Sequence, residues 1–113
     1  MPKSRNDKLQ GTLTLLVLRT LESRGALHGY GLCEHIRQVS GELLEMEEGS
    51  LYPALHRLEK QKLVAGSWQT TENGRQAKLY TITAAGRNRL SEVRKHWKSV
   101  ARGVKLVLRF QKV

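Results

Sequence analysis

The sequence has little of several features that would indicate a secreted, membrane-spanning or metal-binding protein. It contains one cysteine, Cys33, two prolines and only 5% aromatic residues in a chain of 113 residues. A lone cysteine cannot form an internal disulfide and offers no thiolate cluster to zinc, so we expect a reducing, cytoplasmic environment and no metal site. The longest apolar run, residues 15–18, is far shorter than the roughly 18 residues that cross a bilayer. No apolar stretch with a small-residue cleavage site follows the charged N-terminus, so we expect no signal peptide.

Acidic residues are scarce as well. Ten Asp and Glu oppose 20 Lys and Arg, which gives a formal net charge of +10 at pH 7. The charge is uneven, because residues 84–113 hold nine basic residues and one acidic residue, whereas residues 34–48 hold five acidic residues and one basic residue. A small domain this basic usually binds a polyanion. Nucleic acid is therefore the leading partner, an anionic membrane surface is the second, and a basic surface that serves only solubility is the third interpretation.

Helical periodicity is visible in three segments of the first half of the chain. The spacing of apolar residues predicts helices over residues 9–22, 28–39 and 49–62. The first helix is apolar on most faces, which in so small a protein suggests cover from a second subunit. Ser50 is expected to cap the third helix, and Pro53 is expected in its first turn, where the missing N–H costs nothing.

A hairpin and a further helix are predicted in the second half. Two strand-like runs, residues 64–71 and 76–83, flank Asn73-Gly74, which is a strong hairpin signal. Thr83 is expected to cap the last helix, in whose first turn Gly86 is a weak residue. Three helices followed by a hairpin give the order of a winged helix-turn-helix, so the predicted fold class is mainly α with a small β-hairpin. We divide the chain into a flexible basic arm (1–8), a winged helix-turn-helix domain (9–83) and a C-terminal helix (84–113).

The apolar residues of the last helix form a narrow stripe. From Leu90 to Val107 they lie 3, 4, 3, 4 and 3 residues apart, which is the a/d pattern of a coiled coil. The stripe is short for an independent coiled coil, so we expect a dimerisation helix that packs against the first helix of a partner subunit. The predicted homodimer interface consists of Leu13, Leu16, Val17, Leu90, Val93, Trp97, Val100 and Val104.

Three stretches of the chain carry a family resemblance. They are residues 27–31 (Leu-His-Gly-Tyr-Gly), 49–59 (Gly-Ser-Leu-Tyr-Pro-Ala-Leu-His-Arg-Leu-Glu) and 80–87 (Tyr-Thr-Ile-Thr-Ala-Ala-Gly-Arg). These stretches are similar to the PadR family of bacterial transcription regulators, and the single helix after the hairpin resembles the short form of that family. The resemblance implies a homodimeric winged helix-turn-helix protein that binds operator DNA, commonly as a repressor.

Under this resemblance residues 49–62 form the recognition helix, and a major groove about 12 Å wide admits one helix. The expected DNA contacts are Ser50, Tyr52, His56, Arg57 and Lys60 on this helix, and Arg75 and Lys78 on the hairpin, or wing. Three of these residues also have a structural interpretation that involves no DNA. Ser50 can be a plain helix cap, Tyr52 a half-buried packing residue and His56 an ordinary surface residue. Arg57 reads guanine or clamps a phosphate, and the wing cations can belong to a solvated turn.

Two residues of the predicted inner faces have a second interpretation. Trp97 is large for a two-helix seam, so it either packs at the interface or forms a flat wall for a small aromatic effector, which the resemblance allows. Cys33 lies on an inner helical face, where it is expected to act as a small hydrophobic residue. A redox sensor would be exposed beside a cation.

The sequence gives no sign of catalysis. It offers no paired nucleophile and base, and its four histidines are scattered without metal-ligand spacing. We therefore expect neither enzymatic activity nor a cofactor, and we predict a sequence-specific regulator that represses transcription by binding a two-fold symmetric site in double-stranded DNA. The alternative is a nonspecific DNA- or RNA-binding winged-helix protein. A membrane-surface adaptor is a third class, disfavoured because the apolar side of the last helix is narrow and mostly valine.

Overall fold

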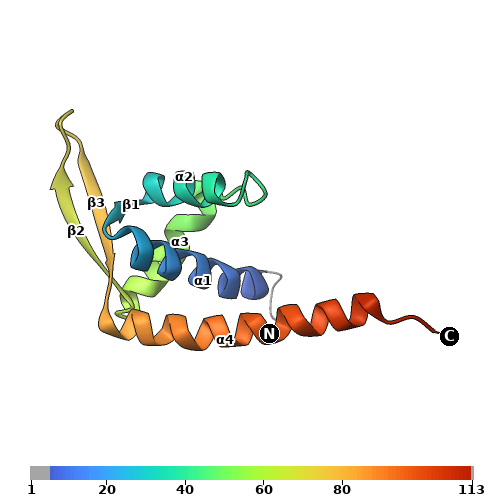
Figure 1. The fold of residues 1–113 in the computed structure, drawn as a ribbon. Helices are drawn as coiled ribbons and strands as arrows, with labels where there is room; N and C mark the ends of the chain where they lie inside the picture. The colour runs from blue at the N-terminus through green and yellow to red at the C-terminus, as the bar shows by residue number, and fades with distance from the viewer. Residues whose placement is uncertain (1–5, 113) are drawn as a thin grey trace.

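The structure, a computed structural model, describes residues 6–112, which form four helices and three strands (Figure 1). In chain order the elements are α1 (Asn6–Arg24), β1 (Leu27–His28), α2 (Gly29–Val39), α3 (Glu48–Lys60), β2 (Val64–Thr70), β3 (Gln76–Ile82) and α4 (Ala84–Arg109). The predicted fold class, a mainly helical winged helix-turn-helix with an added C-terminal helix, is confirmed. The first helix begins at Asn6, inside the segment expected to be a flexible arm, whereas Lys3 and Arg5 of that arm lie outside the described residues.

The three strands form one antiparallel sheet in the order β1-β3-β2. The predicted hairpin is confirmed, and its strands pair from Val64↔Ile82 to Thr70↔Gln76. Strand β1 was not predicted, because a strand of two residues leaves no periodicity in the sequence. Its residue His28 also contacts β3 through its side chain, since Nδ1 lies 3.1 Å from the carbonyl oxygen of Lys78. This strand therefore attaches the start of α2 to the base of the wing.

A single hydrophobic core joins the first three helices, the sheet and the start of α4. Its buried members are Val17, Leu18, Leu21, Leu32, Cys33, Leu51, Leu55, Leu58, Leu63, Val64, Tyr80 and Leu90. Leu51, Leu55 and Leu58 follow the helical period, so they turn one face of α3 into this core. The opposite face of α3 is left to solvent, so its side chains are available to a binding partner.

The start of α3 differs from the prediction. The helix begins at Glu48 after the N-cap residue Glu47, and no side chain caps it. Ser50 is therefore the third residue of the helix, and its predicted role as the cap is wrong. Pro53 is the sixth residue, so it lies in the second turn and leaves the carbonyl of exposed Gly49 to water. An acidic residue in the first turn is favourable beside the positive end of the helix dipole, which explains why the helix extends back to Glu48.

The junction between the sheet and α4 is tightly packed. Thr83 caps α4 as predicted, because its Oγ1 accepts a hydrogen bond of 3.0 Å from the backbone N–H of Gly86. Gly86 is not a weak point of the helix. A Cβ atom at this position would overlap the carbonyl oxygen of Leu63 and would approach Cγ1 of Ile82 to 2.8 Å. The glycine lets the first turn of α4 lie directly against the end of the sheet.

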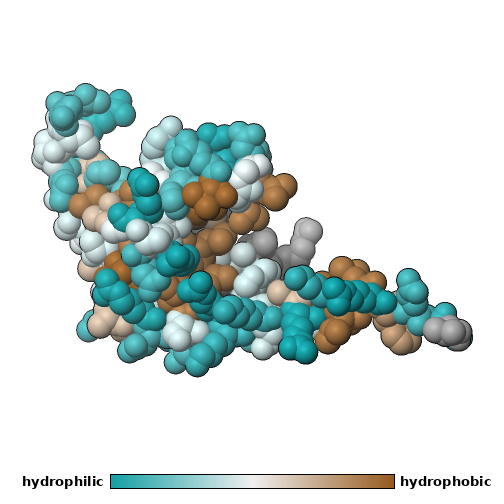
Figure 2. Space-filling model, in the orientation of Figure 1, coloured by the Kyte–Doolittle hydropathy of each residue, from teal (hydrophilic) through white to brown (hydrophobic). Residues whose placement is uncertain are grey.

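Helix α4 runs along α1 of its own chain and then continues past it as an arm (Figure 1). Val17 and Leu90 are buried within one chain, so these two members of the predicted interface belong to the core instead. The exposed fraction rises along the arm to 52% at Val104 and 75% at Val107. Figure 2 shows apolar side chains gathered on this projecting part of α4. Among the described helices, none is long and apolar enough to cross a membrane.

Candidate nucleic-acid interface

Three predicted contact residues form one row on the solvent face of α3. Tyr52, His56 and Lys60 follow one another at intervals of four residues, and all three are exposed. The ring of Tyr52 also lies against the start of α2, since a Cβ atom on Gly29 would be 2.8 Å from its Cε1. Partial burial, with a contribution from the carboxylate of Glu48, raises the pKa of Tyr52 above its usual value. The phenol therefore stays neutral, and its hydroxyl can both donate and accept a hydrogen bond.

Two other predicted contacts, Ser50 and Arg57, lie on a different flank of α3. They are seven residues apart and line a cavity of about 600 Å³ between α1, the segment before α3, and α3 itself. Leu13 and Leu16 of α1 line the same cavity. Nη2 of Arg57 is buried and has no hydrogen-bond partner. The structure therefore turns Arg57 towards α1 and does not bring it together with the row of Tyr52, His56 and Lys60.

The two predicted wing contacts have different surroundings. Arg75 is exposed in the loop between β2 and β3. Lys78 lies further down β3, and its Nζ is 2.7 Å from Oε1 of Glu59 on α3. The hydrogen bond that Nζ of Lys78 donates to the carboxylate of Glu59 is the main cause of the raised pKa of Lys78. Lys78 is therefore fully protonated and already paired within the protein.

Glu59 and Trp68 were not singled out from the sequence, although a signal for their position exists. Side chains alternate between the two faces of a strand, so Lys78 lies on the same face of β3 as buried Tyr80. The pairing of β2 with β3 places Trp68 opposite Lys78. Since Tyr80 faces the core, the two-residue period of the strand also points Lys78 towards the helices. Glu59 is the acidic residue nearest the C-terminal end of α3.

The basic residues are not concentrated on α3. Within α3, Arg57 and Lys60 balance Glu48 and Glu59. Helix α4 instead carries a large share of the positive charge, on Arg87, Arg89, Arg94, Lys95, Lys98, Arg102, Lys105 and Arg109. The exposed row on α3 therefore offers hydrogen-bonding groups more than charge, whereas α4 supplies a positive field.

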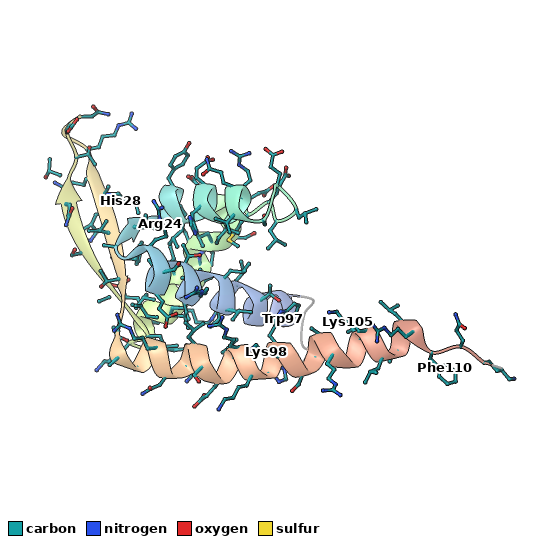
Figure 3. The ribbon with its side chains drawn as sticks, in the orientation of Figure 1. Arg24, His28, Trp97, Lys98, Lys105 and Phe110 are labelled. Carbon is teal, nitrogen blue, oxygen red and sulfur yellow. The ribbon has the colours of Figure 1, made fainter. Side chains whose placement is uncertain are left out.

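A groove of about 450 Å³ lies between α1, α2 and α4. Trp97 lines it with the apolar residues Leu16, Ile36 and Val39, and Lys98 lines it as well. Figure 3 shows Trp97 on the side of α4 that faces α1. The groove thus combines a flat aromatic side chain, an apolar wall and positive charge.

Cys33 is buried, and its surroundings make its thiol poorly reactive. Burial is the largest cause of the raised pKa of Cys33, and the carboxylates of Glu48 and Glu34 raise it further. These surroundings keep the sulfur as a thiol, the less nucleophilic form. Between residues 6 and 112, no group of three or more His, Cys, Asp or Glu side chains could hold a metal ion.

Comparison with known proteins identifies the family of this chain. Residues 17–92 match the transcriptional regulator PadR-like family. The chain belongs to this family. A PadR-family regulator from Eggerthella lenta is 32% identical, with a TM-score of 0.77 over 92% of this chain and 88% of that one. The transcriptional regulator Rv3488 of Mycobacterium tuberculosis is 37% identical over 78 residues, which cover 69% of each chain.

A PadR protein has also been crystallised with DNA. The structure of Bacillus subtilis PadR in complex with operator DNA has a TM-score of 0.66 over 90% of this chain and 50% of that chain. At 20% identity this is a likeness of fold. The family membership confirms the predicted resemblance and makes the protein a DNA-binding transcriptional regulator, not an enzyme.

Proposed function

We propose that this PadR-family regulator acts in the cytoplasm as a homodimeric repressor that binds a two-fold symmetric operator in double-stranded DNA. The observation that carries the proposal is the row of Tyr52, His56 and Lys60 on the exposed face of α3, beside a wing whose tip carries exposed Arg75. A helix in the major groove with a flanking wing can contact base edges and backbone at the same time. Polar side chains in such a row supply the discrimination between base pairs.

The apolar arm of α4 supports a dimer as the binding unit. Its exposed Val100, Val104 and Val107 continue the a/d stripe beyond the part that α1 of the same chain covers. Exposed apolar surface of this kind marks an interaction site. A second copy of the chain is the occupant we propose, since a two-fold interface uses the same patch on both subunits. Leu13 and Leu16 on α1, with Trp97 and Val93 on α4, are the partly covered residues against which the partner's arm would pack.

The dimer is tested by charged substitutions on the stripe. Full burial of a valine side chain stabilises an interface by roughly 1.5–3 kcal/mol, so Val100→Glu combined with Val104→Glu should give monomers. Ser99→Glu is the matched control, because Ser99 is exposed and lies off the stripe. Sedimentation at micromolar concentration distinguishes the two outcomes. A monomeric wild-type protein would contradict the proposal.

The operator is tested by selection from random duplexes. Two recognition helices related by a dimer axis read half-sites about 10 bp apart, or a multiple of that spacing. The selected sites should therefore be inverted repeats, and scrambling one half should remove most of the specific affinity. Selected and scrambled duplexes that bind equally well would favour a nonspecific DNA- or RNA-binding protein. Repression is checked with a reporter gene whose promoter overlaps the selected site.

We propose that a small aromatic effector binds in the groove beside Trp97, between the two subunits of the dimer. Aromatic and apolar walls with a few polar groups are common in small-molecule sites. Lys98 and Arg94 at this groove favour an effector that carries negative charge. Quenching of Trp97 fluorescence by aromatic carboxylates, measured in a Trp68→Phe background, tests this proposal. Quenching that persists in a Lys98→Glu variant with unchanged affinity would argue against the charge preference.

A further inference from the structure

An ion pair joins the recognition helix to the wing. Nζ of Lys78 on β3 lies 2.7 Å from Oε1 of Glu59 on α3, and the side chains are only 19% and 31% exposed. The other ion pairs of the described residues lie within one helix or link α2 to the turn that follows it. Lys78 and Glu59 are therefore in a position to fix one DNA-binding element relative to the other.

Aromatic rings surround the ammonium group of Lys78. Its Nζ lies 5.5 Å from the ring centre of Trp68 and 5.7 Å from that of Tyr80. Both distances are within the range of cation–π attraction. Trp68 is directly opposite Lys78 in the hairpin, yet 66% of its surface is exposed. The lysine stem thus crosses from β3 towards α3 between an exposed and a buried aromatic ring.

The backbone of β2 leaves room for this pair. A Cβ atom at Gly66 would lie 2.5 Å from Cε of Lys78 and 3.2 Å from Oε2 of Glu59. A side chain at position 66 would therefore displace the lysine or the glutamate. The glycine, the two charged residues and the two aromatic rings form one consistent packing arrangement.

The ion pair lies where the wing leaves the body of the protein, so it can influence the position of the wing. Beyond Gly66 every residue of β2 is exposed, so the outer wing is a two-stranded hairpin without a core of its own. Such a hairpin alone is marginally stable in water. Lys78 and Glu59 attach it to α3 near the point where it leaves the body of the protein. The pair can thus determine how far Arg75 at the tip lies from the exposed row on α3.

We propose that Lys78 and Glu59 form a strap that holds the wing at a fixed distance from the recognition helix, so that both elements contact DNA together. Lys78 is then a positioning residue and not a phosphate contact. This inference rests on the proposed operator binding, and it gives Glu59, an acidic residue on a DNA-binding helix, a reason to be there. Without the strap, the wing would have to be ordered when DNA binds, which weakens binding.

Glu59→Gln separates the strap from a simple electrostatic role. Removing an acidic side chain from a DNA-binding surface should by itself strengthen binding to the polyanion. The strap predicts the opposite, a loss of about tenfold in operator affinity, and the same loss for Lys78→Met and for the double variant. Tighter binding by Glu59→Gln, or losses that multiply in the double variant, would overturn the proposal.

The salt dependence of binding provides the second measurement. Arg75→Ala should remove one phosphate contact per subunit, so the log–log slope of affinity against salt should shrink by roughly 1.8 for a dimer. Lys78→Met should weaken binding and leave that slope unchanged. An equal change of slope in both variants would make Lys78 a phosphate contact. Exchanging the charges with Lys78→Glu and Glu59→Lys should restore much of the lost affinity, and no recovery would count against the strap.

Amide hydrogen exchange tests the strap without DNA. In Lys78→Met, Glu59→Gln and Gly66→Ala, the outer amides of β2 and β3 should exchange faster than in the wild type, because the hairpin opens more often. Arg75→Ala should leave them unchanged. Unchanged exchange in the first three variants would overturn the strap. Wild-type protein that binds selected and scrambled DNA equally would overturn the operator proposal instead, so the two failures are distinguishable.

Discussion

Replacing Arg57 by methionine should stabilise the protein and leave its choice of DNA sequence unchanged. Nη2 of Arg57 is buried without a hydrogen-bond partner, and leaving a buried polar group unsatisfied costs about 1–3 kcal/mol. Methionine keeps an unbranched apolar stem against α1 and removes the unsatisfied group. Part of the Arg57 side chain reaches solvent, so we take the lower end of this range, about 1 kcal/mol. For a domain of this size that corresponds to a rise in melting temperature of roughly 4 °C.

Lys60→Met is the matched control for Arg57→Met. Both changes replace a cation of α3 by the same side chain, but Lys60 lies on the exposed row and Arg57 lines the cavity beside α1. Lys60→Met should leave the melting temperature unchanged and weaken operator binding. Arg57→Met should keep the ratio of affinities for selected and scrambled duplexes within about twofold, because no base contact is lost.

The opposite pattern would refute this reasoning. If Arg57→Met abolished discrimination between the two duplexes and left the melting temperature unchanged, the guanidinium would have to reach the DNA. A lost base contact costs roughly 1–3 kcal/mol per site, which titration at fixed salt resolves readily. Thermal unfolding and duplex titration on the same two preparations therefore decide which flank of α3 faces the DNA.

Three further changes test the packing on which the site depends. Gly86→Ala should cost about 1–3 kcal/mol in thermal unfolding, because the added Cβ meets the backbone of Leu63, whereas Asn88→Ala on the exposed side of α4 should cost far less. Thr83→Ala should cost about 1 kcal/mol through loss of the N-cap. Cys33 should react slowly with iodoacetamide at pH 8 in the native state and rapidly in urea, because its raised pKa leaves less thiolate; equal rates would contradict its burial.

The order of helices and the hairpin could be predicted from the sequence because local signals agree there. Leu51, Leu55 and Leu58 define the inner face of α3, and Asn73-Gly74 marks the hairpin between two runs of strand-forming residues. The start of α3 could not be placed in this way. Ser50 looks like a cap, but Glu48, two residues earlier, can begin the helix through its favourable interaction with the helix dipole.

The roles of the basic residues were harder to predict, because they depend on neighbours that are distant in the sequence. Helical spacing places Arg57 off the inner face of α3, but it does not say that α1 lies on that side. Strand alternation places Lys78 on the face of Tyr80, but Glu59 meets it only through the packing of α3 on the sheet. Burial of Val17 and Leu90 likewise follows from the contact of α4 with α1 of the same chain.

The positions of Arg57 and Lys78 change which residues can contribute to DNA affinity and which to the choice of sequence. Arg57 is turned towards α1 and Lys78 is paired to Glu59. In the operator binding that we propose, the predicted contact cations that remain for the phosphates at this surface are therefore Lys60 and Arg75. Discrimination in this proposed binding then depends on Tyr52 and His56, whose side chains can form directional hydrogen bonds to base edges. The positive field of α4 lies on a different element and acts at long range, where it raises the rate of encounter with DNA of any sequence. Rising salt should therefore weaken binding to all duplexes more than it weakens the preference for one of them.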